Sequence, residues 1–418
     1  MKKVFKKLYV WVLIGILIGC IIGFVAPEFG AKLKPLSDAF IGLIKMLISP
    51  IIFCTVVLGI AGATDLRQLG RVGGKAFLYF EILTTFALAL GLIVANVIKP
   101  GAGMNIDPSS LDAQTVAVYF KEASKMSVVD HFLHIIPKTF IDAFTGGGDL
   151  LQVLLIAVLF GVATAKVGTV ARPIVDIVEK FSKILFSMMS MLMYLAPIGA
   201  GAAMAFTVGK FGWVALKQQL FFVLLFYSTC IFFVVVILGS VAYFYGKFNI
   251  LKFLRYIKEE LLTVLGTSSS ETALVPIMNK LEKLGCPKSI VGIVVPSGYS
   301  FNLDGTAIYM TLAGLFIAQA LNIDLTMGQQ LMMLLVAMLT SKGASGVTGS
   351  GFIILAATLA VIPAIPTAGL YIVLGVDRFM SESRALTNII GNAVATIVVS
   401  KSEQQLDTEA LHKELNNS

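Results

Sequence analysis

The stretch GTSSSETALVP (residues 266–276) places three consecutive serines and a glutamate between two apolar arms. Each arm has roughly 10–13 residues, and at about 1.5 Å of rise per residue it crosses only half of a hydrocarbon core about 30 Å thick. Backbone groups at the polar tip cannot face lipid, so the tip must be buried in protein or line a wet cavity. The pattern predicts a re-entrant hairpin over 251–287. The alternative is that the serines only cap a cytoplasmic helix.

A second segment, 328–364, repeats this arrangement around the small-residue tip SKGASGVTGSG (341–351). The first segment is flanked by the cationic residues Lys252, Arg255, Lys258, Lys280, Lys283 and Lys288. The connections beside the second, 322–330 and 364–369, contain no lysine or arginine. By the positive-inside rule, the first hairpin enters from the cytoplasm and the second from outside. Two opposed hairpins, each followed by an apolar helix with polar residues, indicate an inverted repeat with a midplane site.

The composition places the rest of the chain in a membrane. Its 418 residues are 57% hydrophobic and 13% charged, with a mean hydropathy of +0.90, which is outside the range of soluble proteins. Apolar spans are predicted near 8–26, 38–62, 76–98, 131–165, 174–207, 216–245, 288–320 and 367–400. The net charge of +8 gathers in short connections, which favours contact with anionic lipid heads over nucleic acid. We expect an all-α, multi-pass protein of the cell inner membrane with eight spans, two hairpins and both termini cytoplasmic.

The last span carries a polar stripe. In GVDRFMSESRALTNIIGN (375–392) the stripe residues are Asp377, Ser381, Arg384, Asn388 and Asn392, at intervals of 4, 3, 4 and 4. This spacing follows one face of an α-helix. An arginine at mid-bilayer costs roughly 2.5–3.5 kcal/mol, so it normally faces a partner or a cavity. Its planar guanidinium suits a carboxylate, and Arg384 is predicted to bind an anionic substrate. The open alternative is an internal bridge to Asp377.

Polar residues also interrupt two other spans. In SFNLDGTAIY (300–309), an unwound Asp-Gly step is predicted, with Asn302 and Asp304 offering oxygens to a cation such as sodium. Glu81, close to Thr84 and Thr85, is a second intramembrane carboxylate that could carry a proton. The alternative for Glu81 is a helix-end residue that reaches the interface.

Together these features resemble the dicarboxylate/amino acid:cation symporter family, which includes the glutamate transporters. The resemblance covers nearly the whole chain and rests on Ser268–Ser270, NLDGT (302–306), GASGVTGSG (343–351) and the stripe of the last span. It implies that substrate is bound by Ser268, Ser269, Ser270, Thr306, Val347, Thr348, Gly351, Ser381, Arg384 and Asn388. It implies that cations or protons are bound by Glu81, Thr84, Thr85, Asn302, Asp304, Asp377, Asn388 and Asn392.

Three departures from the family pattern narrow the expected substrate. Amino-acid-transporting members carry an acidic residue at the position of Ser381, where it receives the substrate ammonium. Serine supplies no such charge, so succinate, fumarate and malate fit better. Asn392 stands where sodium-driven members have a cation-binding aspartate, and Glu81 stands where they have a neutral residue. The chain looks most similar to the bacterial four-carbon dicarboxylate branch, which is commonly proton-coupled.

We therefore expect a secondary active importer of four-carbon dicarboxylates, coupled to protons, with sodium as an open second ion and no other cofactor. The alternatives are a sodium- or proton-coupled amino-acid symporter and, more distantly, a channel or an intramembrane serine hydrolase using Ser269 or Ser270. The hydrolase lacks a histidine in a span beside its serine, and no P-loop for ATP is present in the sequence. We expect no enzyme activity.

The resemblance also implies a homotrimer that works by an elevator motion. Its scaffold would comprise residues 1–75 and 131–207. Its transport domain would comprise residues 76–98 and 208–400. Residues 99–130 would form an external loop. The charged tail, 401–418, is expected to be cytoplasmic and loosely ordered.

Overall fold

A computed structural model describes residues 8–61, 66–108, 111, 117, 135–145, 150–341, 350–360, 362 and 364–417. Within these residues the chain forms helices, turns and bends, and no β-strand. The first half comprises α1 (Leu8–Val25), α2 (Pro27–Lys32), α3 (Lys34–Ala61), α4 (Leu66–Ile98), α7 (Asp142–Thr145), α8 (Leu150–Val167), η2 (Gly168–Ala171), α9 (Arg172–Met193) and α10 (Ala196–Gln218).

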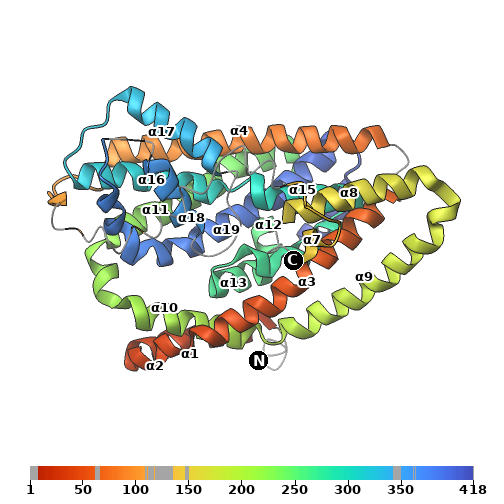
Figure 1. Cartoon of the computed structure of the whole chain (residues 1–418), viewed down its shortest axis with the longest axis horizontal. Helices are drawn as coiled ribbons and strands as arrows, with labels where there is room; N and C mark the ends of the chain where they lie inside the picture. Colours follow the sequence, from red (N-terminus) through yellow and green to blue (C-terminus); the bar gives the residue numbers. More distant parts are fainter. Residues whose placement is uncertain are drawn as a thin grey trace.

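The second half begins with α11 (Leu220–Phe232), η3 (Phe233–Leu238), η4 (Val241–Gly246) and α12 (Ile250–Tyr256). It continues with α13 (Lys258–Thr267), η5 (Ser270–Ala273), α14 (Leu274–Lys283), α15 (Lys288–Phe301), α16 (Asp304–Ala320), α17 (Met327–Thr340), α18 (Ser350–Ala360), η7 (Thr367–Leu370), α19 (Tyr371–Ser402) and α20 (Thr408–Asn416). In Figure 1, α1, α2, α9 and α10 run along the lower edge, whereas α4, α11 and α15 to α19 form the thicker part above them.

Four helical stretches of the described chain are long and apolar enough to cross a membrane: Gly70–Ile98, Gln152–Met189, Leu220–Gly246 and Lys288–Ala320. Shorter apolar helices include Val10–Val25, Met327–Thr340 and Gly351–Ala360. The most apolar windows of Gln152–Met189 and Lys288–Ala320 are 28% and 94% buried, respectively. The α15–α16 pair is therefore enclosed by protein, while α8 and α9 present apolar side chains outward. The total of eight spans stays a prediction.

Glycines in α1 allow this helix to lie directly against α10. A Cβ atom on Gly15 would lie 2.2 Å from the backbone oxygen of Pro197, and one on Gly19 would lie 2.1 Å from that of Gly201. Side chains at these positions would push the two backbones apart. Small residues at intervals of four along a helix favour such close packing.

Two predicted spans differ from the helices of the described chain. The span predicted over 131–165 contains the short helix α7 and then α8, which begins at Leu150, and the span predicted over 174–207 divides into α9 and α10 around Tyr194 and Leu195. Pro197, in the first turn of α10, has no amide hydrogen to continue the preceding helix. An apolar run that is continuous in sequence hides this break.

The two predicted hairpins have the expected short arms. Helices α13 and α14 contain 10 residues each, and α17 and α18 contain 14 and 11. The hydroxyl oxygens of Thr340 and Thr358 lie 3.1 Å apart and join α17 to α18. The second tip, 342–349, lies outside the described residues. How deep either tip sits in a membrane stays a prediction.

The expectation of a loosely ordered tail was wrong. Asp407 accepts hydrogen bonds from the amides of Glu409 and Ala410 at the start of α20, and Leu411 and Leu415 are buried. An N-cap aspartate followed by leucines four residues apart is a helix signal. The high charge of the tail obscured it.

Candidate functional site

Hydroxyl groups hold the tip of the first hairpin together. α13 ends at Ser268, whose φ is 54°. Thr272 donates a hydrogen bond to the carbonyl of Ser269 at 2.8 Å, and Tyr299 of α15 donates one to the carbonyl of Ser270 at 2.7 Å. Ser268, Ser269 and Ser270 are all buried. The side-chain oxygen of Ser269 has no hydrogen-bond partner within the described chain, so it is available to a ligand.

Arg384 is a buried cation on α19. Its Nη1 donates a hydrogen bond to Oδ1 of Asp377 at 2.6 Å, and its guanidinium lies 4.1 Å from the centre of the Tyr309 ring. The internal bridge that sequence analysis left open is therefore present. The hydrogen bond joins one nitrogen to one oxygen and is not a bidentate pair. The guanidinium thus retains the capacity to exchange this partner for another carboxylate.

The first turn of α18 lies against Arg384. A Cβ atom on Gly351 would lie 3.2 Å from Cζ and 3.3 Å from Nε of the guanidinium. The start of α18 therefore packs directly against this group. Val347 and Thr348, which the resemblance also assigns to substrate, lie outside the described residues.

Asn388 ties α19 to the start of α16. Its Oδ1 accepts a hydrogen bond from the amide of Gly305 at 2.8 Å, and its Nδ2 donates one to the hydroxyl of Thr306 at 3.3 Å. Thr306 is thereby brought beside the polar stripe, as predicted. Ser381 is buried on the same helix.

The predicted cation residues gather where α15 gives way to α16. The break falls at Asn302 and Leu303. The prediction of an unwound Asp-Gly step was wrong by two residues, because Asp304 and Gly305 form the first turn of α16. Nδ2 of Asn302 donates a hydrogen bond to Oδ2 of Asp304 at 3.1 Å. A Cβ on Gly391 would lie 2.3 Å from that same oxygen, so the carboxylate lies directly against α19.

Three of the predicted cation residues carry a buried oxygen atom that is unpaired within the described chain. Oδ1 of Asn302, Oδ1 of Asn392 and the hydroxyl of Thr84 are buried and have no hydrogen-bond partner within the described chain. Buried polar atoms are normally paired, and amide, hydroxyl and carboxylate oxygens are the ligands that hard cations prefer. These residues therefore fit a sodium ion. Thr85 does not share this property, because it is exposed and its hydroxyl donates a hydrogen bond to the carbonyl of Glu81. The side chain of Glu81 is partly buried.

Glu382 is a site residue that sequence analysis missed. The sequence by itself suggests only a pair at i, i+4 between Glu382 and Arg378, whose side chain lies outside the described part of the chain. Glu382 is buried, and its carboxylate lies 3.5 Å from the hydroxyl of Ser268 and 3.4 Å from that of Tyr227. It thus links α19 to the tip of the first hairpin. An acid inside an apolar span was the available signal.

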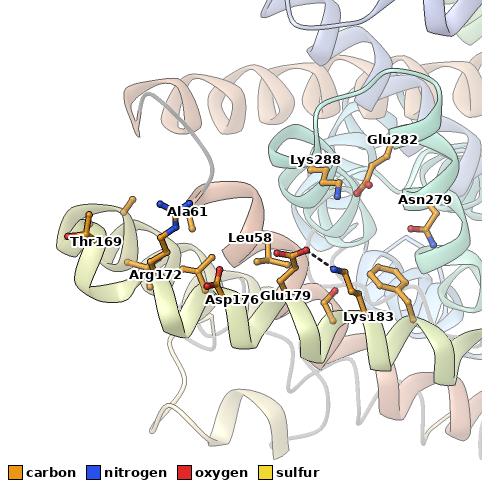
Figure 2. A pocket seen from close by; sticks show the side chains of 16 residues that line it. Leu58, Ala61, Thr169, Arg172, Asp176, Glu179, Lys183, Asn279, Glu282 and Lys288 are labelled. Atoms are coloured by element: carbon orange, nitrogen blue, oxygen red, sulfur yellow. Dashed lines mark ion pairs between the residues drawn. The ribbon is translucent and has the colours of Figure 1, made fainter.

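A large hollow lies away from this site. It has a volume of about 900 Å³ and a charged lining. Figure 2 shows Asp176, Glu179 and Lys183 of α9 on one wall and Glu282 and Lys288 on the facing elements. None of the predicted substrate residues that the structure describes lines it. Those residues are instead buried.

The chain matches the model of the sodium:dicarboxylate symporter family over residues 8–402. The chain belongs to this family. Three similar proteins are each named C4-dicarboxylate transport protein. Those of Laribacter hongkongensis, Paraburkholderia phymatum and Cupriavidus necator are 56%, 58% and 57% identical. The matches cover 100%, 99% and 99% of this chain, and 94%, 97% and 96% of those proteins.

Family membership confirms the resemblance drawn from the sequence. Members are transporters, which points away from the serine hydrolase. The helical, apolar structure fits a membrane protein of the sodium:dicarboxylate symporter family.

Proposed function

We propose that this protein is a secondary active symporter that imports C4-dicarboxylates such as succinate, fumarate and malate. The observation that carries the proposal is the buried guanidinium of Arg384, held by a single hydrogen bond to Asp377 beside a neutral Ser381. A site with the cation Arg384 and no acidic residue at position 381 suits a dicarboxylate substrate that carries no ammonium group. The names of its relatives support the same substrate class.

Substrate entry is an exchange of partners at Arg384. One substrate carboxylate takes the guanidinium from Asp377 and forms a bidentate pair, with Thr306 beside it. The other carboxylate accepts hydrogen bonds from Ser269, Ser270 and Asn388. Gly351 then closes against the occupied guanidinium, because a glycine leaves room for this approach. Asp377 is left to bind a proton or cation.

The balance of buried charge supports cation coupling. Among the described residues, the buried acids are Glu260, Glu271, Asp304, Asp377 and Glu382, whereas the one buried cation is Arg384. Glu260 is paired with Lys280. A dianion entering such an acidic region needs accompanying positive charge. Protons on Glu81 and Asp377 are the proposed coupling ions, with sodium at Asn302, Asp304 and Asn392 as a second.

Amino-acid symport is the second candidate. Glu382 favours it, because this carboxylate follows Ser381 directly and reaches Ser268 at the hairpin tip. An ammonium group could pair with it in place of an acid at position 381.

Uptake into proteoliposomes separates the two candidates. Labelled succinate and labelled aspartate are supplied under an inward proton gradient, with and without sodium. We expect succinate to be accumulated at least tenfold faster than aspartate. Preferential uptake of aspartate, abolished by Glu382→Gln, would support amino-acid symport instead.

Several proposals extend beyond the site. We infer a homotrimer with scaffold regions 1–75 and 131–207 and a moving unit built from 76–98 and 208–400. The tight seam between α1 and α10 is consistent with a rigid scaffold. Both termini are proposed to be cytoplasmic.

A further inference from the structure

The apolar stretch Leu220–Gly246 ends in a group of exposed aromatic residues. Tyr243, Phe244 and Tyr245 are 67%, 71% and 47% exposed. Tyrosine is enriched where a spanning helix meets the membrane–water interface, since its ring is apolar and its hydroxyl is polar. The end of this stretch therefore lies at the level of the lipid headgroups.

The chain turns sharply at this level and forms a hollow. Lys247 adopts the left-handed conformation, with φ of 61°, and Asn249 then caps α12. The hollow has a volume of about 380 Å³. It is lined by Tyr243, Lys247, Phe248, Asn249, Lys252, His412, Leu415 and Asn416. Its wall thus joins the end of the span to α12 and α20.

Positive charge gathers around this hollow. Lys247 and Lys252 line it, and both are exposed. Nζ of Lys252 donates to the neutral amide oxygen of Asn416 at 2.7 Å. Nearby, Nζ of Lys401 donates to the carbonyl of Gly246 at 3.2 Å. Both acceptors are neutral, and no ion pair of Lys247, Lys252 or Lys401 is present among the described residues.

We propose that this hollow binds the phosphate of an anionic phospholipid headgroup. Lys247 and Lys252 would pair with the phosphate, while Tyr243 and Asn249, which line the same hollow, would offer a hydroxyl and an amide to polar headgroup atoms. The acyl chains would follow the apolar, exposed surface of η3 and η4, where Val235 and Val236 are 41% and 44% exposed. Lysine beside an interfacial aromatic group, at the end of an apolar helix, is the chemistry that anionic lipid requires.

Thermal unfolding of the purified full-length protein in neutral detergent tests this proposal. Phosphatidylglycerol, phosphatidylcholine and inorganic phosphate are titrated separately at matched phosphate concentrations. We expect phosphatidylglycerol alone to raise the midpoint of unfolding. In Lys247→Gln/Lys252→Gln its apparent affinity should fall roughly thirtyfold, and in each single variant roughly fivefold. Lys247→Arg/Lys252→Arg should retain binding.

The control is Lys166→Gln/Lys180→Gln, which loses the same charge at exposed positions elsewhere. It should bind phosphatidylglycerol as the unmodified protein does. Equal binding by Lys247→Gln/Lys252→Gln would overturn the proposal. If inorganic phosphate raises the unfolding midpoint equally, the hollow binds a free anion. If phosphatidylcholine raises it equally, the effect comes from the acyl chains. Either result would contradict a headgroup site. If the double variant does not fold, the single variants decide the question.

Discussion

At the scale of single residues, the proposed substrate site depends on the buried pair formed by Arg384 and Asp377. Removing one partner of a buried ion pair leaves the other charge uncompensated, at a cost of about 3 kcal/mol or more. A substrate carboxylate can restore that compensation. The pair therefore links the stability of the empty protein to its affinity for substrate.

Asp377→Asn tests this link. Without substrate, we expect the variant to unfold at a lower temperature than the unmodified protein, because Arg384 loses its charged partner. Saturating succinate should raise the unfolding midpoint of the variant by more than it raises that of the unmodified protein. Thermal unfolding with and without succinate measures both effects. An unchanged midpoint in the empty variant would show that the pair has no energetic role.

Glu81→Gln tests the proposed proton carrier. A glutamine cannot take up a proton, so succinate uptake by the variant should lose much of its dependence on external pH, whereas uptake by the unmodified protein should be faster with an acidic exterior. Uptake into proteoliposomes at a series of external pH values measures this. Glu28→Gln, at an exposed position, is the matched control. If Glu81→Gln keeps the pH profile of the control, another group carries the proton.

Arg384, Asp304 and Asn302 could be proposed as site residues from the sequence, because charged or amide groups inside apolar spans are rare and need partners. It did not predict the role of Glu382. That residue lies one position from the polar stripe, and only the fold brings Ser268 and Tyr227 to it. The contacts of Asn388 with Gly305 and Thr306 likewise join segments about 80 residues apart.

At the scale of helices, short arms were predictable from length, whereas helix ends were not. The arms of both hairpins follow from apolar runs too short to span a bilayer. The break between α9 and α10 escaped prediction, since hydropathy is continuous across it and only Pro197 marks it. Likewise, the helix α20 depends on Asp407 and two leucines within a charged tail.

Gly19→Ala tests the packing of α1 on α10. The added methyl group would meet the backbone oxygen of Gly201 at 2.1 Å, so we expect a loss of about 1–3 kcal/mol in stability and a lower unfolding midpoint in detergent. The matched control is Gly42→Ala, where a Cβ meets nothing within 4 Å; it should be neutral or slightly stabilising. Equal midpoints for the two variants would mean that α1 and α10 separate at little cost.

At the scale of the whole molecule, Glu403 joins two distant parts of the chain. It follows α19 and forms ion pairs with Arg71 at 2.9 Å and Lys75 at 2.6 Å, both near the start of α4. Burial acts to raise the pKa of Glu403, but hydrogen bonds from Lys75 and Arg71 outweigh it and lower the pKa below its usual 4.5. The ionised carboxylate is thus favoured by folding.

Glu403→Gln should remove a stabilising contribution that depends on pH. Because the pKa is lower in the folded state, the contribution is fully present above the usual 4.5 and is lost as the pH falls through the folded value. The variant should therefore unfold at a lower temperature than the unmodified protein at neutral pH, and the difference should shrink in acid below pH 4.5. Glu409→Gln, at an exposed position, is the control. A difference that stays constant with pH would exclude the ion pairs as its source.

The family, the helical class and the symporter class were predictable from the sequence because they depend on hydropathy and on a combination of motifs. The closed arrangement around Arg384 was not, since it depends on contacts between α16, α18 and α19. Trimer formation and the elevator motion involve more than one chain or state, and they stay predictions.

Uptake of labelled succinate by proteoliposomes that contain Arg384→Gln tests substrate recognition most directly. We predict a fall of at least about thirtyfold in uptake relative to the unmodified protein, since truncating one member of a buried charged pair costs about 2–5 kcal/mol and about 1.4 kcal/mol corresponds to a factor of ten. Arg384→Lys should restore only a small part of the succinate uptake, because an ammonium group cannot form the bidentate pair with a carboxylate. Succinate uptake by Arg384→Gln at the unmodified rate would contradict a dicarboxylate site at this guanidinium.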